Sequence, residues 1–312
     1  MRVPRTTKLI VTASLWMLAN PASALDIALT NDDGWDAMGI TVMKDALEAA
    51  GHTVTLAAPL YDQSGSSMAL DMSPLTVTKR APGVYSVALY PNAAVAVRPA
   101  NCALAAIGIV QESGHSPDLL VSGINTSANI GMAALLSGTV GAANHAAASV
   151  MNGPVPAIAV GTDEPSCDLA CKRAHYEVVA DFVVRFIAHL ETKPGFLASE
   201  AKLLPDGVGL VISYPTSDTV QGVKVASLSN AVLMGGQRFT GAFMCAGSGC
   251  SGLAVDASQR SRIVPLPDAT PEVKNADLGF YAAGYVTIVP IVPDITATSP
   301  LVFKSVVEGF MP

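Results

Sequence analysis

Residues 26–58 read DIALTNDDGWDAMGITVMKDALEAAGHTVTLAA and contain the pattern that decides the fold. Asp26 to Thr30 is a short apolar stretch typical of a strand, and the polar turn Asn31-Asp32-Asp33-Gly34 ends it. Residues 39–50 then place apolar side chains at helical spacing on one face, and a glycine follows. Residues 53–58 are the next apolar strand. A strand, a helix and a strand within about thirty residues predict a parallel sheet.

The same alternation continues along the chain as far as residue 213. Further strand-like stretches lie at 84–89, 94–97, 118–122, 156–160 and 209–213, and helical stretches at 100–111, 138–151 and 175–190. Alternating strands and helices predict an α/β fold with a doubly wound, mostly parallel sheet. Residues 216–275 are rich in Ser, Gly and Pro and predict a C-terminal β-rich arm or excursion, whereas 278–292 is strand-like again.

The composition limits the classes of protein that fit. The chain has 312 residues, half of them hydrophobic, which is enough for one large domain with a sizeable core. Only 14% of residues are charged and the formal net charge is -7, so there is no basic footprint for a nucleic-acid polymer. A negative protein that binds a negative substrate needs local compensation, which a metal ion or a helix N-terminus supplies. The apolar stretch 132–150 is built largely of Ala, Gly, Ser and Asn, so we expect no membrane span.

The first 24 residues are typical of a secretory signal peptide. The positive stretch 2–8 precedes the apolar stretch 9–19, and Ala22-Ser23-Ala24 is a small-residue cleavage site. A buried N-terminal strand or helix fits poorly, because three cations and no acid precede the apolar residues. We therefore expect cleavage after Ala24, a mature domain of residues 25–312, and a periplasmic or secreted location.

The five cysteines agree with export. Cys167 and Cys171 are four residues apart and Cys245 and Cys250 are five apart, so each pair can close a local disulfide in an oxidising compartment. A zinc site built from these four cysteines is the alternative, although the spacings are not those of C-x2-C. Cys102 is left over, and its apolar helical surroundings predict a buried, inert thiol.

Two adjacent acidic residues follow the first strand. In an open parallel sheet, ligands bind outside the C-terminal ends of the strands, which is where Asp32 and Asp33 lie. Neighbouring carboxylates repel each other unless a positive charge lies between them, and Gly34 permits a turn that brings both to one site. A divalent cation would satisfy the pair, but an Asp-rich turn that caps a helix explains the same residues without a metal.

Further loops end at the same edge of the predicted sheet. Residues 63–67 (QSGSS) follow the second strand, and residues 121–125 (VSGIN) end a buried strand before residues 128–131 (ANIG). Ser137-Gly138-Thr139 then opens a helix whose unpaired amides and positive dipole end can bind phosphate. A flexible loop and a capped helix without a ligand are the alternatives. Together the loops offer hard oxygen ligands without sulfur or imidazole, which favours Mg, Mn or Ca over zinc.

Six short motifs occur in order along the mature chain. They are residues 29–40 (LTNDDGWDAMGI), 58–65 (APLYDQSG), 99–102 (PANC), 117–125 (PDLLVSGIN), 128–131 (ANIG) and 137–140 (SGTV). Weaker similarities follow at 212–215 (ISYP) and 283–290 (AGYVTIVP), so nearly all of the mature chain is covered. In these motifs the chain resembles the SurE family of 5'/3'-nucleotidases.

The resemblance implies a Rossmann-like fold, a divalent metal, with Mg2+ or Mn2+ expected, and hydrolysis of nucleoside 5'-monophosphates, with 3'-monophosphates as second candidate substrates. The implied metal ligands are Asp32, Asp33, Ser64 and Asn125, and the implied phosphate-binding groups are Asn129, Ser137, Gly138 and Thr139. The family also implies a homodimer or homotetramer formed through a C-terminal arm, which residues 216–275 would suit.

The chain departs from the family pattern at three places. Asn144-His145 stands where an acidic residue is usual, Leu136 replaces a Tyr, and Asn101 replaces an Asp. We expect a structural or interface role for His145 rather than a catalytic one. None of the four implied metal ligands is altered, so the departures bear on substrate preference and on oligomer contacts.

The predicted reaction is metal-assisted hydrolysis of a phosphomonoester. The cation would polarise a phosphate oxygen and lower the pKa of a bound water, while Asn129 and the 137–139 turn stabilise the equatorial oxygens. Asp32 and Asp33 would act as the catalytic metal ligands, and one of them can also orient the water. A covalent aspartyl-phosphate route fits less well, because phosphatases of that class favour an Asp-x-Asp spacing. A periplasmic nucleotide- or phosphate-binding protein without catalysis is the alternative function.

Overall fold

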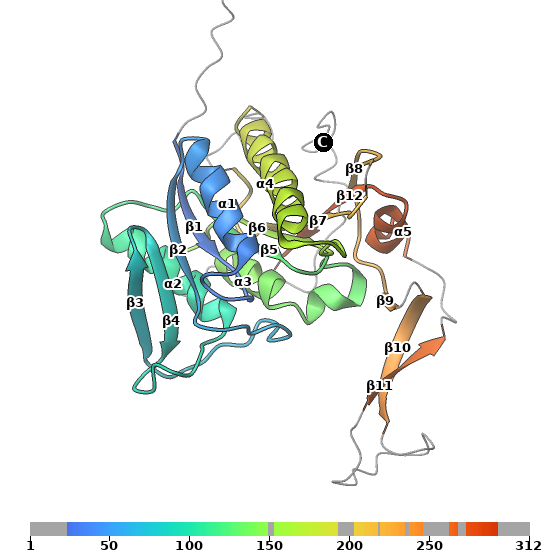
Figure 1. Cartoon of the computed structure of the whole chain (residues 1–312), viewed down its shortest axis with the longest axis horizontal. Helices are drawn as coiled ribbons and strands as arrows, with labels where there is room; N and C mark the ends of the chain where they lie inside the picture. Colours follow the sequence, from blue (N-terminus) through green and yellow to red (C-terminus); the bar gives the residue numbers. More distant parts are fainter. Residues whose placement is uncertain are drawn as a thin grey trace, which may run out of the picture.

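The structure is a computed structural model, and it describes residues 24–148, 153–192, 203–217, 219–234, 237–245, 262–267 and 273–292. The described residues form a nine-stranded sheet flanked by helices (Figure 1), together with a three-stranded sheet of order β11-β10-β9. The predicted signal peptide lies outside the described residues.

The elements alternate along the chain as the sequence predicts. The strands of the large sheet are β1 (Asp26–Thr30), β2 (Thr53–Pro59), β3 (Leu75–Ala81), β4 (Val84–Leu89), β5 (Leu119–Asn125), β6 (Ala157–Thr162), β7 (Gly209–Tyr214), β8 (Val223–Val225) and β12 (Val286–Ile291). The helices are α1 (Met38–Ala49), α2 (Pro99–Glu112), the 3-10 helix η1 (Gly131–Leu135), α3 (Gly138–Ala147), α4 (Leu169–Glu191) and α5 (Asp277–Ala282). The small sheet contains β9 (Val232–Met234), β10 (Gln237–Cys245) and β11 (Arg262–Pro267).

The order of the parallel strands creates a place for a ligand. The strands β4-β2-β1-β5-β6-β7 are parallel neighbours in the doubly wound order of a Rossmann fold. Their connections reverse direction between β1 and β5, and ligands bind outside the C-terminal ends of strands at such a switch point. β3 is antiparallel to β4, and β12 is antiparallel to β7. The predicted α/β fold with a mostly parallel sheet is therefore confirmed.

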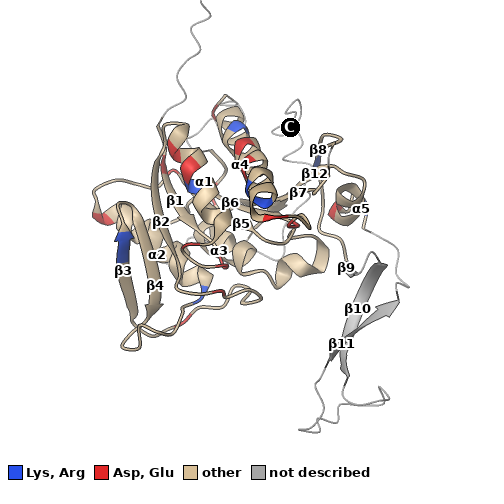
Figure 2. Cartoon of the chain, in the orientation of Figure 1, with Lys and Arg blue, Asp and Glu red and all other residues tan. Residues whose placement is uncertain are grey.

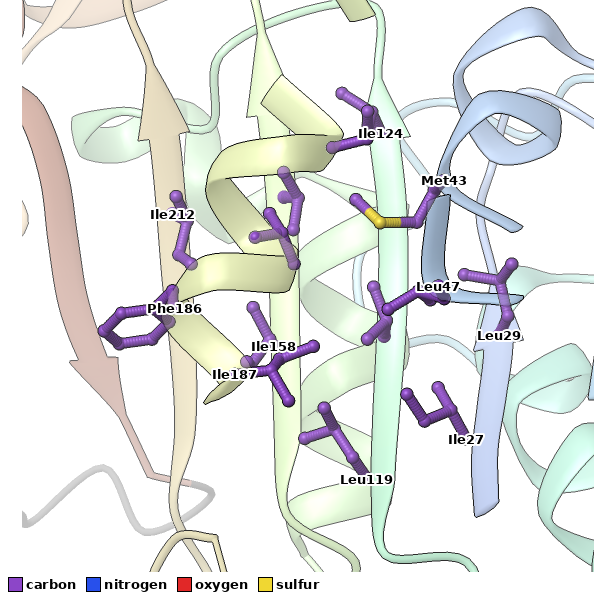
Figure 3. Close-up of a cluster of buried hydrophobic side chains, with 14 of the residues drawn as sticks. Ile27, Leu29, Met43, Leu47, Leu119, Ile124, Ile158, Phe186, Ile187 and Ile212 are labelled. Carbon is purple, nitrogen blue, oxygen red and sulfur yellow. The ribbon is translucent and has the colours of Figure 1, made fainter. Parts of the chain in front are cut away.

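The two faces of the sheet bury side chains of different size. Successive side chains on a strand point to opposite faces, so Leu119 packs on one side of β5 and Leu120 on the other. The face under α1 and α4 is filled by Ile, Leu, Met and Phe side chains (Figure 3). The face under α2 and α3 is rich in alanine, and α3 itself is buried along most of its length. The apolar stretch around α3 is thus a close-packed core helix, and the described residues contain no helix suited to crossing a membrane.

Several predicted elements differ from the structure. Residues 94–97 form no strand, because only Ala96 makes an isolated bridge. The predicted strand 278–292 is wrong in its first half, where Leu278 and Tyr281 lie three residues apart on the buried side of α5. β3 was not predicted, since its mostly exposed LTVTKRA sequence buries no apolar face. The predicted arm at 216–275 includes β8, which pairs with β12 in the large sheet.

One of the two predicted disulfides is present. Cys167 and Cys171 are bonded, with their Cα atoms 5.9 Å apart, and this pairing excludes them as zinc ligands. Cys250 lies outside the described residues, so the Cys245–Cys250 bond stays a prediction. Cys102 is a free, buried thiol in α2 as predicted, and its burial raises its pKa well above the usual value.

Candidate active site

The chain leaves the sheet in a tight turn directly after β1. Gly34 has a φ of +119°, a conformation that side chains disfavour, and its amide donates to Asn31 Oδ1 at 3.2 Å. The Trp35 amide donates to the Pro59 carbonyl at 3.0 Å, which ties the turn to the end of β2. The turn therefore holds Asp32 and Asp33 at the switch point between β1 and β5.

Asp32 is the better satisfied of the two carboxylates. Its Oδ2 accepts from the Thr139 amide at 3.1 Å, and its Oδ1 accepts from the Thr139 hydroxyl at 2.5 Å. Burial nevertheless raises the pKa of Asp32, although these hydrogen bonds lower it. The start of α3 approaches so closely that a Cβ on Gly138 would lie 3.0 Å from the Asp32 Cβ. The glycine in this motif is thus needed for contact between α3 and the aspartate.

Asp33 is poorly satisfied. Its Oδ1 accepts from the Thr126 hydroxyl at 3.3 Å, but its buried Oδ2 has no hydrogen-bond partner among the described residues. Burial, together with the negative charge of Asp32, raises the pKa of Asp33 to about 7. Figure 2 marks Lys and Arg on β3 and α4, and among the described residues no ion pair involves either carboxylate. A cation is the group that this pair lacks.

Two asparagines extend the site from the end of β5. The Asn125 amide nitrogen donates to the Ser127 carbonyl at 2.9 Å and to Asn129 Oδ1 at 3.4 Å, which leaves its own carbonyl oxygen as the candidate metal ligand. The Asn129 side chain is buried and its Nδ2 has no acceptor in the described part of the chain. A Cβ on Gly161 would lie 2.8 Å from that nitrogen, so β6 packs directly behind it. Asn129 therefore offers an unused donor of the kind that a phosphate oxygen accepts.

Ser64 reaches the site on an exposed loop after β2. The Gln63 amide donates to the Asp32 carbonyl at 2.7 Å, which brings this loop to the aspartate turn. Both the amide and the hydroxyl of Ser64 donate to Asp62 Oδ1, at 2.8 and 2.7 Å. Asp62 is a residue that sequence reasoning left unassigned, and its negative charge helps to raise the pKa of both Asp32 and Asp33. Its position two residues before the candidate ligand Ser64 is the sequence feature that could have predicted its place in the site.

The start of α3 supplies fewer free donors than its sequence predicts. Ser137 caps the helix, since its Oγ accepts from the Val140 amide at 3.2 Å. The amide and hydroxyl of Thr139 are both occupied by Asp32, so in this structure Thr139 orients the carboxylate. The amide of Gly138, in the first turn, has no intrahelical acceptor by geometry. The phosphate role predicted for Thr139 stays a prediction.

His145, which stands where the family pattern has an acid, contacts the Ser64 loop. Its Nε2 lies 2.6 Å from the Met68 carbonyl, while its buried Nδ1 has no partner among the described residues. The same loop is held by the Ser67 amide, which donates to the Leu136 carbonyl at 3.1 Å. The contact fits the structural role expected for His145, because it joins α3 to the loop that carries Ser64.

The fold and this site define a Rossmann-like α/β protein with a carboxylate pair and a helix start at the switch point. The family model described as "Survival protein SurE" matches residues 27–234, and the chain belongs to this family. It is 34% identical over 210 residues to 5'-nucleotidase SurE of Xylella fastidiosa, covering 65% of this chain and 70% of that one. It is 35% identical over 209 residues to 5'-nucleotidase SurE of Gloeobacter violaceus, covering 65% and 69%.

A solved structure has the same fold. The SurE protein from Aquifex aeolicus is similar with a TM-score of 0.63 and 24% identity, over 90% of this chain and 97% of that one. At this identity the similarity supports the shared fold. The family resemblance inferred from the sequence motifs is confirmed.

Proposed function

We propose that the chain is a metal-dependent phosphatase that hydrolyses nucleoside monophosphates to a nucleoside and phosphate. The observation that carries the proposal is the Asp33 carboxylate, whose buried Oδ2 meets no donor in the part of the chain that the structure describes and whose neighbour is the carboxylate of Asp32. The relatives that bear the name 5'-nucleotidase support the choice of a nucleotide as the substrate. The side chains at this site offer hard oxygen ligands, which suit Mg2+ or Mn2+.

The residues present fit such an ion. Asp32 and Asp33 supply two carboxylates. Asn125 supplies its side-chain carbonyl oxygen, because its hydrogen bonds to Ser127 and Asn129 are made by the amide nitrogen. The Ser64 hydroxyl would complete the set by leaving its present acceptor, Asp62. A bound divalent cation polarises a phosphate oxygen and lowers the pKa of a coordinated water. Thr139 keeps Asp32 oriented for that role through two hydrogen bonds.

The phosphate would lie beside the aspartates, next to Asn129 and the start of α3. The Asn129 Nδ2 and the Gly138 amide are donors that can meet its oxygens, and the Ser137 hydroxyl can donate while it accepts from Val140. Donors fixed before the reaction stabilise the charge that develops on the equatorial oxygens, because they need no reorganisation. The Asn129 side chain packs directly against Gly161, which suits this task.

The proposal includes export of the protein and its assembly into a homo-oligomer. The local Cys167–Cys171 disulfide supports an oxidising compartment, and so favours a periplasmic or secreted protein whose signal peptide is cleaved after Ala24. A homodimer or homotetramer formed through the 216–275 arm would leave the switch-point site on each subunit. Size-exclusion chromatography with light scattering and the mass of the exported chain test these two points.

Phosphate release from AMP tests the proposed activity. The purified protein is assayed with Mg2+ or Mn2+ and with EDTA, and we expect release only when a metal is present. Tight binding of AMP without release would instead favour the alternative of a nucleotide-binding protein. The same assay over 5'- and 3'-monophosphates and polyphosphate then ranks the substrates.

A further inference from the structure

The loop that carries Asn129 is held from both ends. At its start, the Ala128 amide donates to Asp163 Oδ1 at 3.0 Å. At its end, the Gly131 amide donates to Asp277 Oδ2 at 2.8 Å in a buried contact. Asp163 directly follows β6, whereas Asp277 is the first residue of α5 and lies 146 positions away from Gly131. The candidate phosphate donor is thus fixed by a part of the chain far from it in sequence.

Asp277 is wholly buried and accepts hydrogen bonds from the backbone of three segments. Its Oδ1 accepts from the Ser229 amide at 2.7 Å and from the Leu278 amide at 2.8 Å, while Oδ2 accepts from Gly131. One carboxylate therefore joins three segments, which are the Asn129 loop, the stretch after β8 and α5. Removing any one of these donors would leave the buried carboxylate less well satisfied, which lowers the free energy of unfolding.

Tyr281, one turn further along α5, reaches the other end of the loop. Its hydroxyl donates to Asp163 Oδ2 at 3.0 Å, so the carboxylate that holds Ala128 is itself held by α5. Burial raises the pKa of Tyr281, which keeps the phenol protonated and able to donate. Apolar contacts follow the same path, in a separate buried cluster of Ala128, Ile130, Ala231, Leu278 and Tyr281.

We propose that Asp277, and Tyr281 acting through Asp163, are positioning residues that hold Asn129 in place for the phosphate. We call Asp163, Asp277 and Tyr281 the C-terminal brace. The proposal rests on the proposed function, because it gives Asn129 the task of meeting the substrate's phosphate. It also assigns a task to α5, which lies beyond residue 234, where the match to the family model ends.

The geometry explains why a brace is useful here. Gly131 has a φ of +54°, and a Cβ there would lie 2.1 Å from the Ala231 carbonyl oxygen, so the loop passes directly against the stretch after β8. The Met132 amide donates to that same carbonyl at 3.0 Å. A loop anchored at Ala128, Gly131 and Met132 leaves Asn129 little freedom, and a displacement of about 1 Å at a reacting group can cost about 100-fold in rate.

Two nearly isosteric substitutions test the brace. Asp277→Asn keeps an oxygen for Ser229 and Leu278 but presents an NH2 group to the Gly131 N–H, and Tyr281→Phe removes only the hydroxyl that reaches Asp163. We expect kcat/KM for AMP to fall about 10- to 100-fold in Asp277→Asn and about 3- to 10-fold in Tyr281→Phe. Tyr285→Phe is the matched control, since its ring contacts Phe280 and Lys224 rather than the loop, and we expect the wild-type value.

A double-mutant cycle separates positioning from a general loss of structure. In an Asn129→Ala background, Asp277→Asn should lower kcat/KM by less than about 2-fold, because the group that it positions is already gone. An equal loss in both backgrounds, or a wild-type kcat/KM in the single variant, would overturn the proposal. If Asp277→Asn does not fold, the same cycle with Tyr281→Phe decides the matter.

Amide hydrogen exchange gives a readout that does not depend on turnover. In Asp277→Asn we expect faster exchange in peptides covering residues 126–132, with exchange in β1 and α1 unchanged. Unchanged exchange in 126–132 would contradict the brace. Should the wild-type protein release no phosphate from any nucleotide, the proposed function fails, whereas the exchange experiment still reports on whether α5 holds the loop.

Discussion

Two regions of the molecule bury aspartates, and they treat them differently. In the C-terminal brace, the oxygens of Asp277 accept from the backbone N–H groups of Gly131, Ser229 and Leu278. At the β1 turn, Asp33 has a long hydrogen bond from Thr126, a second carboxylate beside it and an oxygen that no donor among the described residues reaches. Buried polar groups are normally satisfied within a fold. Asp277 therefore serves the fold itself, whereas the unsatisfied Asp33 supports the proposal that this aspartate binds a ligand.

The largest expected effect is the loss of metal-dependent turnover when Asp33 is replaced. Asp33→Asn removes a charge from the proposed metal site, so metal-dependent turnover of AMP should fall about 1,000-fold, more than the 10- to 100-fold usual for an outer partner of a metal ligand. Asp36→Asn, an exposed acid on the same turn, is the matched control and should retain wild-type turnover. Wild-type rates in Asp33→Asn would remove Asp33 from the site.

The stability of the metal-free protein should depend on pH through Asp33. The pKa of Asp33 is raised to about 7 in the folded chain, so between pH 4 and 7 the folded state holds a proton that the unfolded state has lost. The free energy of unfolding in EDTA should therefore fall as pH rises through this range, by about 2–4 kcal/mol, and level off above pH 7. Urea unfolding measures it. A similar decline in Asp33→Asn would assign the proton to another group.

The changes in the free energy of unfolding should have opposite signs for Asp33→Asn and Asp277→Asn. At pH 8 in EDTA, Asp33→Asn should stabilise the protein by about 1 kcal/mol, because it removes a buried charge beside Asp32. Asp277→Asn should destabilise it by about 1–3 kcal/mol, because a donor then faces the Gly131 N–H. Urea unfolding of both variants compares them directly. Two changes of the same sign would mean that the two aspartates play similar parts.

A smaller effect is expected at the residue that links Asp32 to α3. Thr139→Val keeps the amide bond to Asp32 and loses the hydroxyl bond of 2.5 Å. The pKa of Asp32 should rise further, and metal affinity at pH 7 should fall about 10-fold, as for other partners that orient a metal ligand. Calorimetric titration with Mn2+ measures this. Thr139→Ser keeps the hydroxyl and should bind the metal as the wild type does.

Local sequence was enough to predict the parallel sheet and the position of Asp32 and Asp33. Hydrophobic periodicity is a property of neighbouring residues, and a strand followed by a glycine turn places side chains at a sheet edge wherever the strand lies. The buried face of α1 was also predictable, and Ile40, Met43 and Leu47 are all buried. Short, exposed β3 and the helix α5 escaped prediction, because few residues carry their pattern.

In the candidate site, too, some features were predictable from the sequence and others only from the structure. Sequence motifs by themselves determined the family and named the candidate oxygen ligands and the start of α3. Only the tertiary structure decided that Thr139 is committed to Asp32, that Asp62 adds its charge to the pair, and that Asp277 holds the Asn129 loop. These contacts join residues far apart in the chain. Whether a carboxylate is satisfied or left for a ligand depends on which distant donors the fold brings to it.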